Sequence, residues 1–237
     1  MNSNLIIYSD RCTGTAFPDN TIEAMRILSE RGVKNISISV QANSNNELIV
    51  FHDESLTRLT TNDGYVRHYD NESLSNVTLK SAFGHPEIKI PSLAAFMNSL
   101  LAQESKFNLC IEMRGVNIYR ILVDELIKFN DVIECGLLGL TIASKDHNSL
   151  VMINSLLPVA TTMAIVCGTP LTYTEDIARA GIDKIKIECS FINSLLINDA
   201  NARGVGVFIG GVKDKTDFLK LEDYDIEGVF TLNGVYV

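Results

Sequence analysis

The chain has 237 residues, of which 46% are hydrophobic and 21% charged, with a formal net charge of −9. This length and apolar content are enough for one substantial core. The acidic balance argues against broad nucleic-acid binding, which needs a basic surface to neutralise phosphates. No apolar run approaches the roughly 18 residues of a membrane span, and the first residues lack the basic segment and longer apolar core of a secretory signal.

The five cysteines are scattered along the chain, at Cys12, Cys110, Cys135, Cys167 and Cys189. Their number is odd and their spacing matches no paired metal motif. We therefore expect reduced thiols, buried as this side chain usually is, in a cytoplasmic protein without a membrane span.

Short apolar runs alternate with helical patterns along the whole chain. The first run (5–8) is followed by a helical segment (21–31), which Thr21 can cap and after which Gly32 can end the helix. The further expected strands are 36–40, 47–51, 109–113, 137–142, 161–166, 184–187, 205–209 and 228–231, and the further expected helices are 92–102, 118–129, 146–156, 174–180, 192–202 and 216–221. About eight strand–helix repeats favour parallel pairing in a closed (β/α)8 TIM barrel, with a doubly wound open sheet as the alternative.

A polar, turn-rich stretch interrupts this alternation at residues 54–91. Turn signals such as Asn62-Asp63-Gly64 divide it, and its few apolar residues show no sustained period. We expect an insertion after an early strand that forms a small cap over one barrel end, within a single domain covering residues 1–237.

Polar residues alternate with apolar ones in four of the expected strands. In a (β/α)8 barrel the apolar face packs against the outer helices, so the polar face points inward. Active sites of such barrels lie at the C-terminal ends of the strands, and we expect a site there. The inward-facing residues are Ser37 and Ser39, His52, Cys110, Glu112 and Arg114, and Lys184, Lys186 and Glu188.

Six short motifs follow one another over residues 5–114, and the resemblance thins out beyond them. They are Arg11, Phe17-Pro18-Asp19-Asn20-Thr21, His52-Asp53, the segment 56–64 that begins Leu56-Thr57-Arg58, Ile90-Pro91-Ser92-Leu93 and Ile111-Glu112-Met113-Arg114. In order and spacing they resemble the His-Arg-Gly, Pro-Glu-Asn-Thr, His-Asp, Leu-x-Arg-Thr-Thr-x-x-Gly, Ile-Pro-Thr-Leu and Ile-Glu-x-Lys motifs of the glycerophosphodiester phosphodiesterase family.

That resemblance implies two catalytic histidines, a divalent cation held by a Glu-x-Asp pair and a later Glu, and an arginine and a lysine on the phosphoryl oxygens. His52, Arg11 and Asp10 become the catalytic candidates, with Asp10 at the position of the first histidine. Arg11, Arg114 and Lys186 are the candidates for substrate binding, with Arg114 in place of the family's lysine.

The resemblance fails at the centre of the family's chemistry. Ser37 and Ser39 replace two metal ligands, which leaves Glu112 as a weak one. Mg²⁺ and Ca²⁺ are held largely by anionic oxygens, so we expect no cofactor, or a weakly bound divalent cation. Asp10 is a poor proton donor at neutral pH because its ordinary pKa is about 4. Losing one group of an acid–base pair costs about 10²–10⁴-fold in rate.

We therefore expect a family-like protein that binds a phosphodiester or phosphorylated glycerol at the barrel mouth, with weak or no metal-dependent hydrolysis. The alternative is an active divergent enzyme that hydrolyses glycerophosphodiesters to glycerol 3-phosphate and an alcohol. Two structural interpretations also stay open: Glu112 paired with Arg114, Lys186 or Arg11 in an ion pair, and the two serines simply filling the barrel. The expected partner is a small phosphorylated molecule, and the oligomeric state is not predicted.

Overall fold

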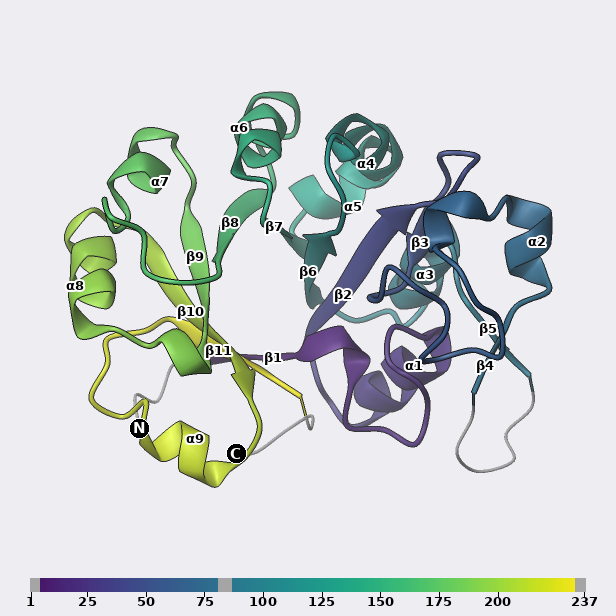
Figure 1. Ribbon diagram of the computed structural model, residues 1–237, viewed down its shortest axis with the longest axis horizontal. Coiled ribbons are helices and arrows are strands. Elements are labelled where there is room, and N and C mark those ends of the chain that lie inside the picture. The colour runs from purple at the N-terminus through teal and green to yellow at the C-terminus, as the bar shows by residue number, and fades with distance from the viewer. Residues whose placement is uncertain (1–4, 81–86, 233–237) are drawn as a thin grey trace.

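Eight parallel strands close into a barrel in the computed structural model, which describes residues 5–80 and 87–232 (Figure 1). The strands of the ring are β1 (Ile6–Ser9), β2 (Asn35–Ala42), β6 (Phe107–Met113), β7 (Leu138–Ser144), β8 (Thr161–Val166), β9 (Lys184–Glu188), β10 (Gly206–Val212) and β11 (Gly228–Thr231). The ring is closed because β1 pairs with both β11 and β2. The (β/α)8 barrel is thus confirmed, and the open sheet is excluded.

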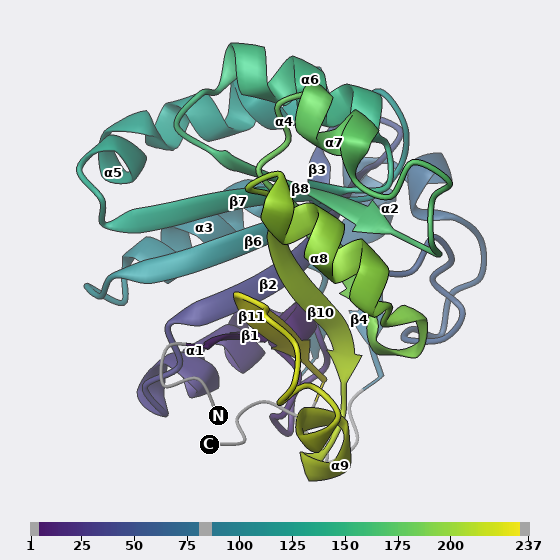
Figure 2. The ribbon, with the colours of Figure 1, turned by 90° about the vertical axis from the view of Figure 1, so that its left-hand side faces the viewer.

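Helices lie on the outside of this ring, as Figures 1 and 2 show. They are α1 (Ile22–Glu30), α3 (Leu93–Leu101), α4 (Tyr119–Leu126), α5 (Asn130–Glu134), α6 (His147–Leu156), α7 (Glu175–Arg179), α8 (Ser194–Ala202) and α9 (Lys215–Leu219). Thr21 caps α1 as predicted, because its Oγ1 accepts a hydrogen bond from the Ala24 amide at 3.2 Å. None of these helices, in the part of the chain described, has the length and apolar character to cross a bilayer.

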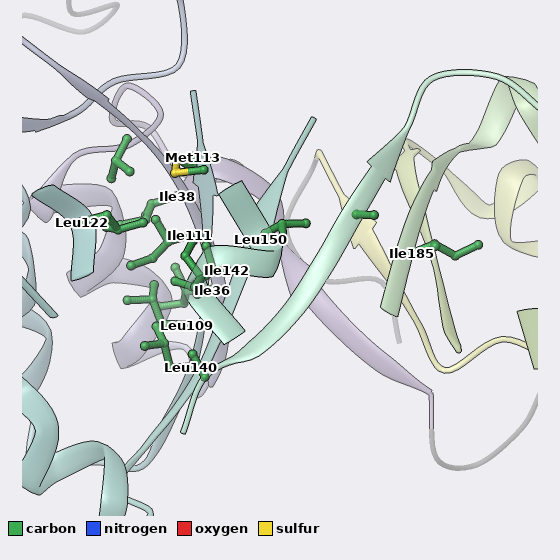
Figure 3. Close-up of a cluster of buried hydrophobic side chains, with 14 of the residues drawn as sticks. Ile36, Ile38, Leu109, Ile111, Met113, Leu122, Leu140, Ile142, Leu150 and Ile185 are labelled. Atoms are coloured by element: carbon green, nitrogen blue, oxygen red, sulfur yellow. The ribbon is translucent and has the colours of Figure 1, made fainter. Parts of the chain in front are cut away.

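The largest core lies between the strands and the helices, where the predicted apolar faces meet. Figure 3 shows side chains of β2 and β6 gathered with Leu122 of α4. The strand residues labelled there include Ile36 and Ile38 of β2 and Ile111 of β6, all fully buried. Their outward direction leaves the alternate residues of the same strands facing into the barrel.

Aromatic rings fill the interior of the barrel. Tyr8 of β1 stacks on Phe230 of β11 with ring centroids 4.8 Å apart, and Phe208 of β10 meets both rings edge-on. Cys110, Ala143, Met163 and Ile165 also belong to this buried cluster. The packed rings close the middle of the barrel, and (β/α)8 barrels carry their sites at the C-terminal ends of the strands.

The expected strand at 47–51 is not a member of the ring. The observed strand β3 (Leu48–Val50) pairs antiparallel with β2, so that Val40 lies opposite Val50. The connection between the two strands is a short turn, whereas parallel pairing needs a crossover of a dozen or more residues. The Asn43 side chain closes this turn by accepting from the Glu47 amide at 2.9 Å. His52 still reaches the mouth, because the Phe51 amide bonds the Ser39 carbonyl at the end of β2.

The predicted insertion follows this hairpin and has a small core of its own. It contains a short 3₁₀ turn (Val66–His68), α2 (Asn71–Ser75), β4 (Thr78–Leu79) and β5 (Ile88–Lys89). Buried side chains of the segment, including Leu56 and Leu79, pack on Ile49 and Phe51 of the hairpin. Residues 81–86 of the predicted span lie outside the described residues, and the role of the segment as a cap stays a prediction.

The expectation of buried cysteines is wrong for two of the five. Cys12 and Cys110 are buried and Cys189 is half-buried, whereas Cys135 and Cys167 are exposed. Cys135 lies at the end of α5 and Cys167 just after β8, so both stand at the ends of elements, where the chain returns to the surface.

Candidate functional site

A cavity of about 250 Å³ lies at the C-terminal ends of the barrel strands. Its lining holds four cationic side chains and three carboxylates, so it carries one excess positive charge while His52 is neutral. That excess stands out in a chain with a net charge of −9 and suits an anionic ligand. The lining residues are Asp10, Arg11, His52, Glu112, Arg114, Lys145, Ile165, Lys186, Glu188, Gly211 and Leu232.

A strained turn after β1 brings Asp10 and Arg11 to this cavity. Arg11 and Cys12 both have left-handed backbone conformations, with φ of 54° and 56°. The resembling motif has glycine at the position of Cys12, where such a φ is free of strain. Cys12 is fully buried, with its Sγ 4.0 Å from the Ser37 carbonyl oxygen. Burial raises the pKa of this thiol far above its ordinary value, so Cys12 is not a nucleophile at neutral pH.

Glu112 and Arg114 reach the cavity from the end of β6, on the inward face that alternation predicts. Arg114 NH1 donates to Glu112 Oε1 at 2.8 Å and lies 3.3 Å from His52 Nε2. A guanidinium only donates, so Nε2 accepts and the imidazole proton is on Nδ1, which faces Asp53 Oδ1 at 2.9 Å. His52 is therefore held from both sides, with its basic nitrogen turned toward Arg114.

Asp53 is fixed in turn by Arg58, a residue of the insertion. Arg58 NH2 donates to Asp53 Oδ1 at 3.0 Å and also lies 3.9 Å from Asp19 Oδ2, which pairs with Arg11 at 3.5 Å. The hydrogen bond from Arg58 is the largest of the effects that lower the pKa of Asp53, to about 2. The sequence places Arg58 in a motif but gives it no role.

Replacing Arg58 by methionine is expected to destabilise the protein above about pH 4 and to have little effect near pH 2. The carboxyl of Asp53 has a pKa of about 2 in the fold and about 3.9 in an unfolded chain. A depressed pKa stabilises the fold above the unfolded value, and this contribution is lost as the pH falls through the folded value. Because Arg58 is 54% exposed, the loss should not exceed about 1 kcal/mol.

Urea unfolding of the wild type and Arg58→Met between pH 2 and pH 7 measures this difference. Arg67→Met removes a positive charge from the same segment and serves as the control. A stability difference between Arg58→Met and the wild type that stays constant over this pH range would contradict the assignment.

Lys186 lies at the centre of the site, with 5% of its surface exposed. Its Nζ is 3.9 Å from Asp10 Oδ2 and 3.8 Å from Glu112 Oε2. Burial works against the charged ammonium, but the two carboxylates hold the pKa of Lys186 above its ordinary value. Burial likewise opposes ionisation of Glu112, but Lys186 and Arg114 keep its pKa below the ordinary value. Lys186 and Glu112 therefore form a buried, ionised pair that Arg114 extends, as the ion-pair interpretation of Glu112 predicted.

The residues present do not fit the divalent cation that the family resemblance implies. Ser37 Oγ donates to Asp10 Oδ1 at 3.0 Å, so this hydroxyl supplies no anionic oxygen. The hydroxyl of Ser39 is buried and has no hydrogen bond within the described residues. Over residues 5–80 and 87–232, no three His, Cys, Asp or Glu side chains are arranged to hold a metal. The carboxylate of Glu112 is engaged by Arg114 and Lys186 instead.

Lys145 is a site residue that the sequence interpretation missed. It directly follows β7 and lines the cavity together with two neighbouring cavities of about 450 and 400 Å³. Its side chain is exposed, and among the described residues it forms no ion pair. The other cations of the lining face carboxylates, so Lys145 is the excess charge. A lysine immediately after an apolar strand of a predicted barrel was the signal that could have identified it.

The fold and the charged cavity define a (β/α)8-barrel protein of the kind that carries its active site at the C-terminal ends of the strands. The model of the glycerophosphoryl diester phosphodiesterase family matches residues 11–233, and the chain belongs to this family.

Relatives support this assignment over most of the chain. The protein YhdW of Bacillus subtilis is 22% identical over 228 residues, covering 90% of this chain and 88% of YhdW. A glycerophosphodiester phosphodiesterase of Bacillus altitudinis is 29% identical over 157 residues, covering 64% of this chain and 62% of that protein. The fold is similar to that of an Oleispira antarctica phosphodiesterase solved with its product sn-glycerol-3-phosphate, with a TM-score of 0.81, 22% identity and coverage of 96% and 93% of the two chains.

Proposed function

We propose that this chain binds a phosphodiester or phosphorylated glycerol at the barrel mouth and hydrolyses it weakly or not at all by the metal-dependent route. The observation that carries the proposal is the contrast within one cavity. The cationic residues Arg11, Arg114, Lys145 and Lys186 line the cavity, and so does Asp10, at the position that the family resemblance assigns to the first catalytic histidine. Replacement of a group that would transfer a proton, with the cations retained, favours ligand binding over hydrolysis.

Ligand binding is supported by the charge and the size of the cavity. Arginine and lysine are the usual partners of phosphoryl oxygens. Lys145 can bind an anion without releasing a carboxylate, while Arg114 can do so by turning from Glu112 toward the cavity. The Oleispira relative was solved with sn-glycerol-3-phosphate, which makes a glycerol phosphate the natural first ligand to test.

Weak hydrolysis follows from the surroundings of the two candidate acid–base groups. Asp10 accepts from Ser37 and faces the Lys186 ammonium. Both oxygens of the Asp10 side chain are thus engaged within the protein. His52 has its Nε2 atom 3.3 Å from Arg114 NH1, so this nitrogen is already engaged by the guanidinium. Neither group is free to pass a proton to a leaving alcohol, and a general acid contributes about 10²–10⁴-fold.

A cytoplasmic location is part of this proposal. It is supported by the five cysteines, which are all unpaired, since disulfides form in secreted proteins and rarely in the reducing cytosol.

Glycerol 3-phosphate is expected to bind the wild-type protein saturably at one site, and Arg114→Met is expected to weaken this binding about 10- to 100-fold. Hydrogen bonds to charged groups contribute about 1.5–3 kcal/mol, which corresponds to that range. Isothermal titration calorimetry measures both dissociation constants. Arg203→Met is the matched control, because Arg203 lies at the end of α8, on the opposite side of the barrel from the mouth. Absence of binding, or equal affinities of Arg114→Met and wild type, would overturn the proposal.

A further inference from the structure

The ammonium of Lys186 lies in a buried position that is surrounded by side chains from several elements. Lys186 is on β9, and its side chain lies inside the barrel and lines the cavity at the C-terminal ends of the strands. Its Nζ lies 4.3 Å from the centre of the Phe230 ring, which is itself stacked on Tyr8. On the other side are Asp10 Oδ2 at 3.9 Å and Glu112 Oε2 at 3.8 Å. One positive charge is thus fixed between two carboxylates from two other strand ends.

Gly210 of β10 makes room for this side chain. A Cβ atom at this position would lie 2.7 Å from Lys186 Cε and 3.0 Å from Glu188 Oε1. The first distance is shorter than a carbon–carbon contact allows, so any larger residue would displace the lysine. Lys186 is also closely confined, and buried Nζ atoms are tolerated only when paired. The absence of a side chain at Gly210 therefore leaves the space that the Lys186 side chain fills.

The position of the Lys186 ammonium coincides with the place where the family resemblance implies a divalent cation. Glu112 corresponds to the one family carboxylate that this chain keeps, and it is a direct neighbour of the ammonium. Ser39 lies beside Glu112 in the pairing of β2 with β6, and Ser37 bonds the same Asp10 that faces Lys186. Where the family resemblance implies two carboxylates, this chain has the hydroxyls of Ser37 and Ser39, next to the positive charge of Lys186. The exchange keeps the charge of the site close to balance.

We propose that Lys186 is a built-in cation that takes the place of the family's divalent ion, so that anions bind at the mouth without a metal. The ammonium provides one positive charge at a fixed point, and Arg114 and Lys145 provide the further donors around the cavity. No bond is made or broken in this role, and Lys186 acts by offsetting the charge of the bound anion. The claim that anions bind without a metal rests on the proposed function, whereas the claim that Lys186 occupies the cation position does not.

The cation position is tested on the ligand-free protein with Mn²⁺, whose bound fraction is counted by electron paramagnetic resonance. Lys186→Met removes the ammonium and frees Asp10 and Glu112, so we expect it to bind Mn²⁺ at least tenfold more tightly than the wild type. Lys184→Met is the matched control. Lys184 is on the same strand, but it pairs with Glu227 at 2.8 Å, away from the cavity lining. We expect its Mn²⁺ affinity to equal that of the wild type.

Gly210→Ala provides a second variant that keeps every charge. Its methyl group crowds Lys186 Cε and displaces the ammonium, so Mn²⁺ affinity should rise at least threefold even if Lys186→Met does not fold. Equal Mn²⁺ affinities of the wild type and the folded Lys186 and Gly210 variants would overturn the proposal. An equal gain in Mn²⁺ affinity in Lys184→Met would also overturn the proposal, because the gain would then follow from the change in net charge.

The anion part is tested by titrating glycerol 3-phosphate in EDTA and then in Mg²⁺. We expect dissociation constants that agree within twofold, and a loss of at least tenfold in Lys186→Met. Binding that tightens tenfold or more with Mg²⁺ would overturn metal-independent binding. If glycerol 3-phosphate does not bind under either condition, the proposed function fails, while the Mn²⁺ measurement still decides whether Lys186 occupies the cation position.

Discussion

Replacing Glu112 by glutamine should lower the free energy of unfolding by about 3–5 kcal/mol, the range measured when one partner of a buried ion pair is removed. Glu112 is 9% exposed and is shared by Arg114 at 2.8 Å and Lys186 at 3.8 Å. The variant leaves these two cations around a neutral amide, with Asp10 and Glu188 as the acids that still act on Lys186. The size of the side chain hardly changes, so the loss reports charge and not packing.

Urea unfolding monitored by circular dichroism at pH 7 measures this change. Glu175→Gln is the control, because Glu175 also pairs with an arginine, Arg179, but both side chains are exposed. An exposed pair contributes about 0–1 kcal/mol. A loss of less than about 1 kcal/mol in Glu112→Gln would show that the network at the mouth is not the buried, ionised one described above.

Much of the fold could be predicted from the sequence because its signals are local. Strand alternation gave the inward direction of Ser37, Ser39, Glu112 and Lys186, and all four are buried as expected. The cap at Thr21 was also predicted correctly. In contrast, the direction of pairing in β3 depends on the length of a connection rather than on residue type. The predicted parallel strand was therefore wrong, although the strand itself exists.

The residues that line the cavity could be predicted, and so could the pairing of Glu112 with Arg114 or Lys186, but the remaining contacts could not. Asp10, Arg11, His52, Glu112, Arg114 and Lys186 line one cavity. Lys186 is 74 residues from Glu112 and 176 from Asp10 along the chain, so no local pattern shows that it lies between their carboxylates. The contact between Arg114 and His52 Nε2 is hidden for the same reason. Lys145 was missed because a single exposed lysine after a strand resembles any solvated residue.

The wild-type protein is expected to hydrolyse glycerophosphodiesters no faster than a variant without His52. On the proposed function, His52 alone remains of the two acid–base groups that the family resemblance implies, and each such group contributes about 10²–10⁴-fold. The metal-binding carboxylates are replaced by Ser37, whose hydroxyl is committed to Asp10, and by Ser39. On the proposed function, metal-assisted stabilisation of the phosphoryl charge is absent together with one proton transfer. The two losses act on the same step, so their effects on the rate combine.

The most direct test of the account is the rate of glycerophosphocholine hydrolysis, measured as released glycerol 3-phosphate in the presence of Mg²⁺, Ca²⁺ or Mn²⁺. We predict that the wild type, at concentrations where it binds glycerol 3-phosphate, shows no metal-stimulated turnover above His52→Ala. Metal-dependent turnover by the wild type that His52→Ala abolishes would contradict the account and would identify the chain as an active divergent phosphodiesterase.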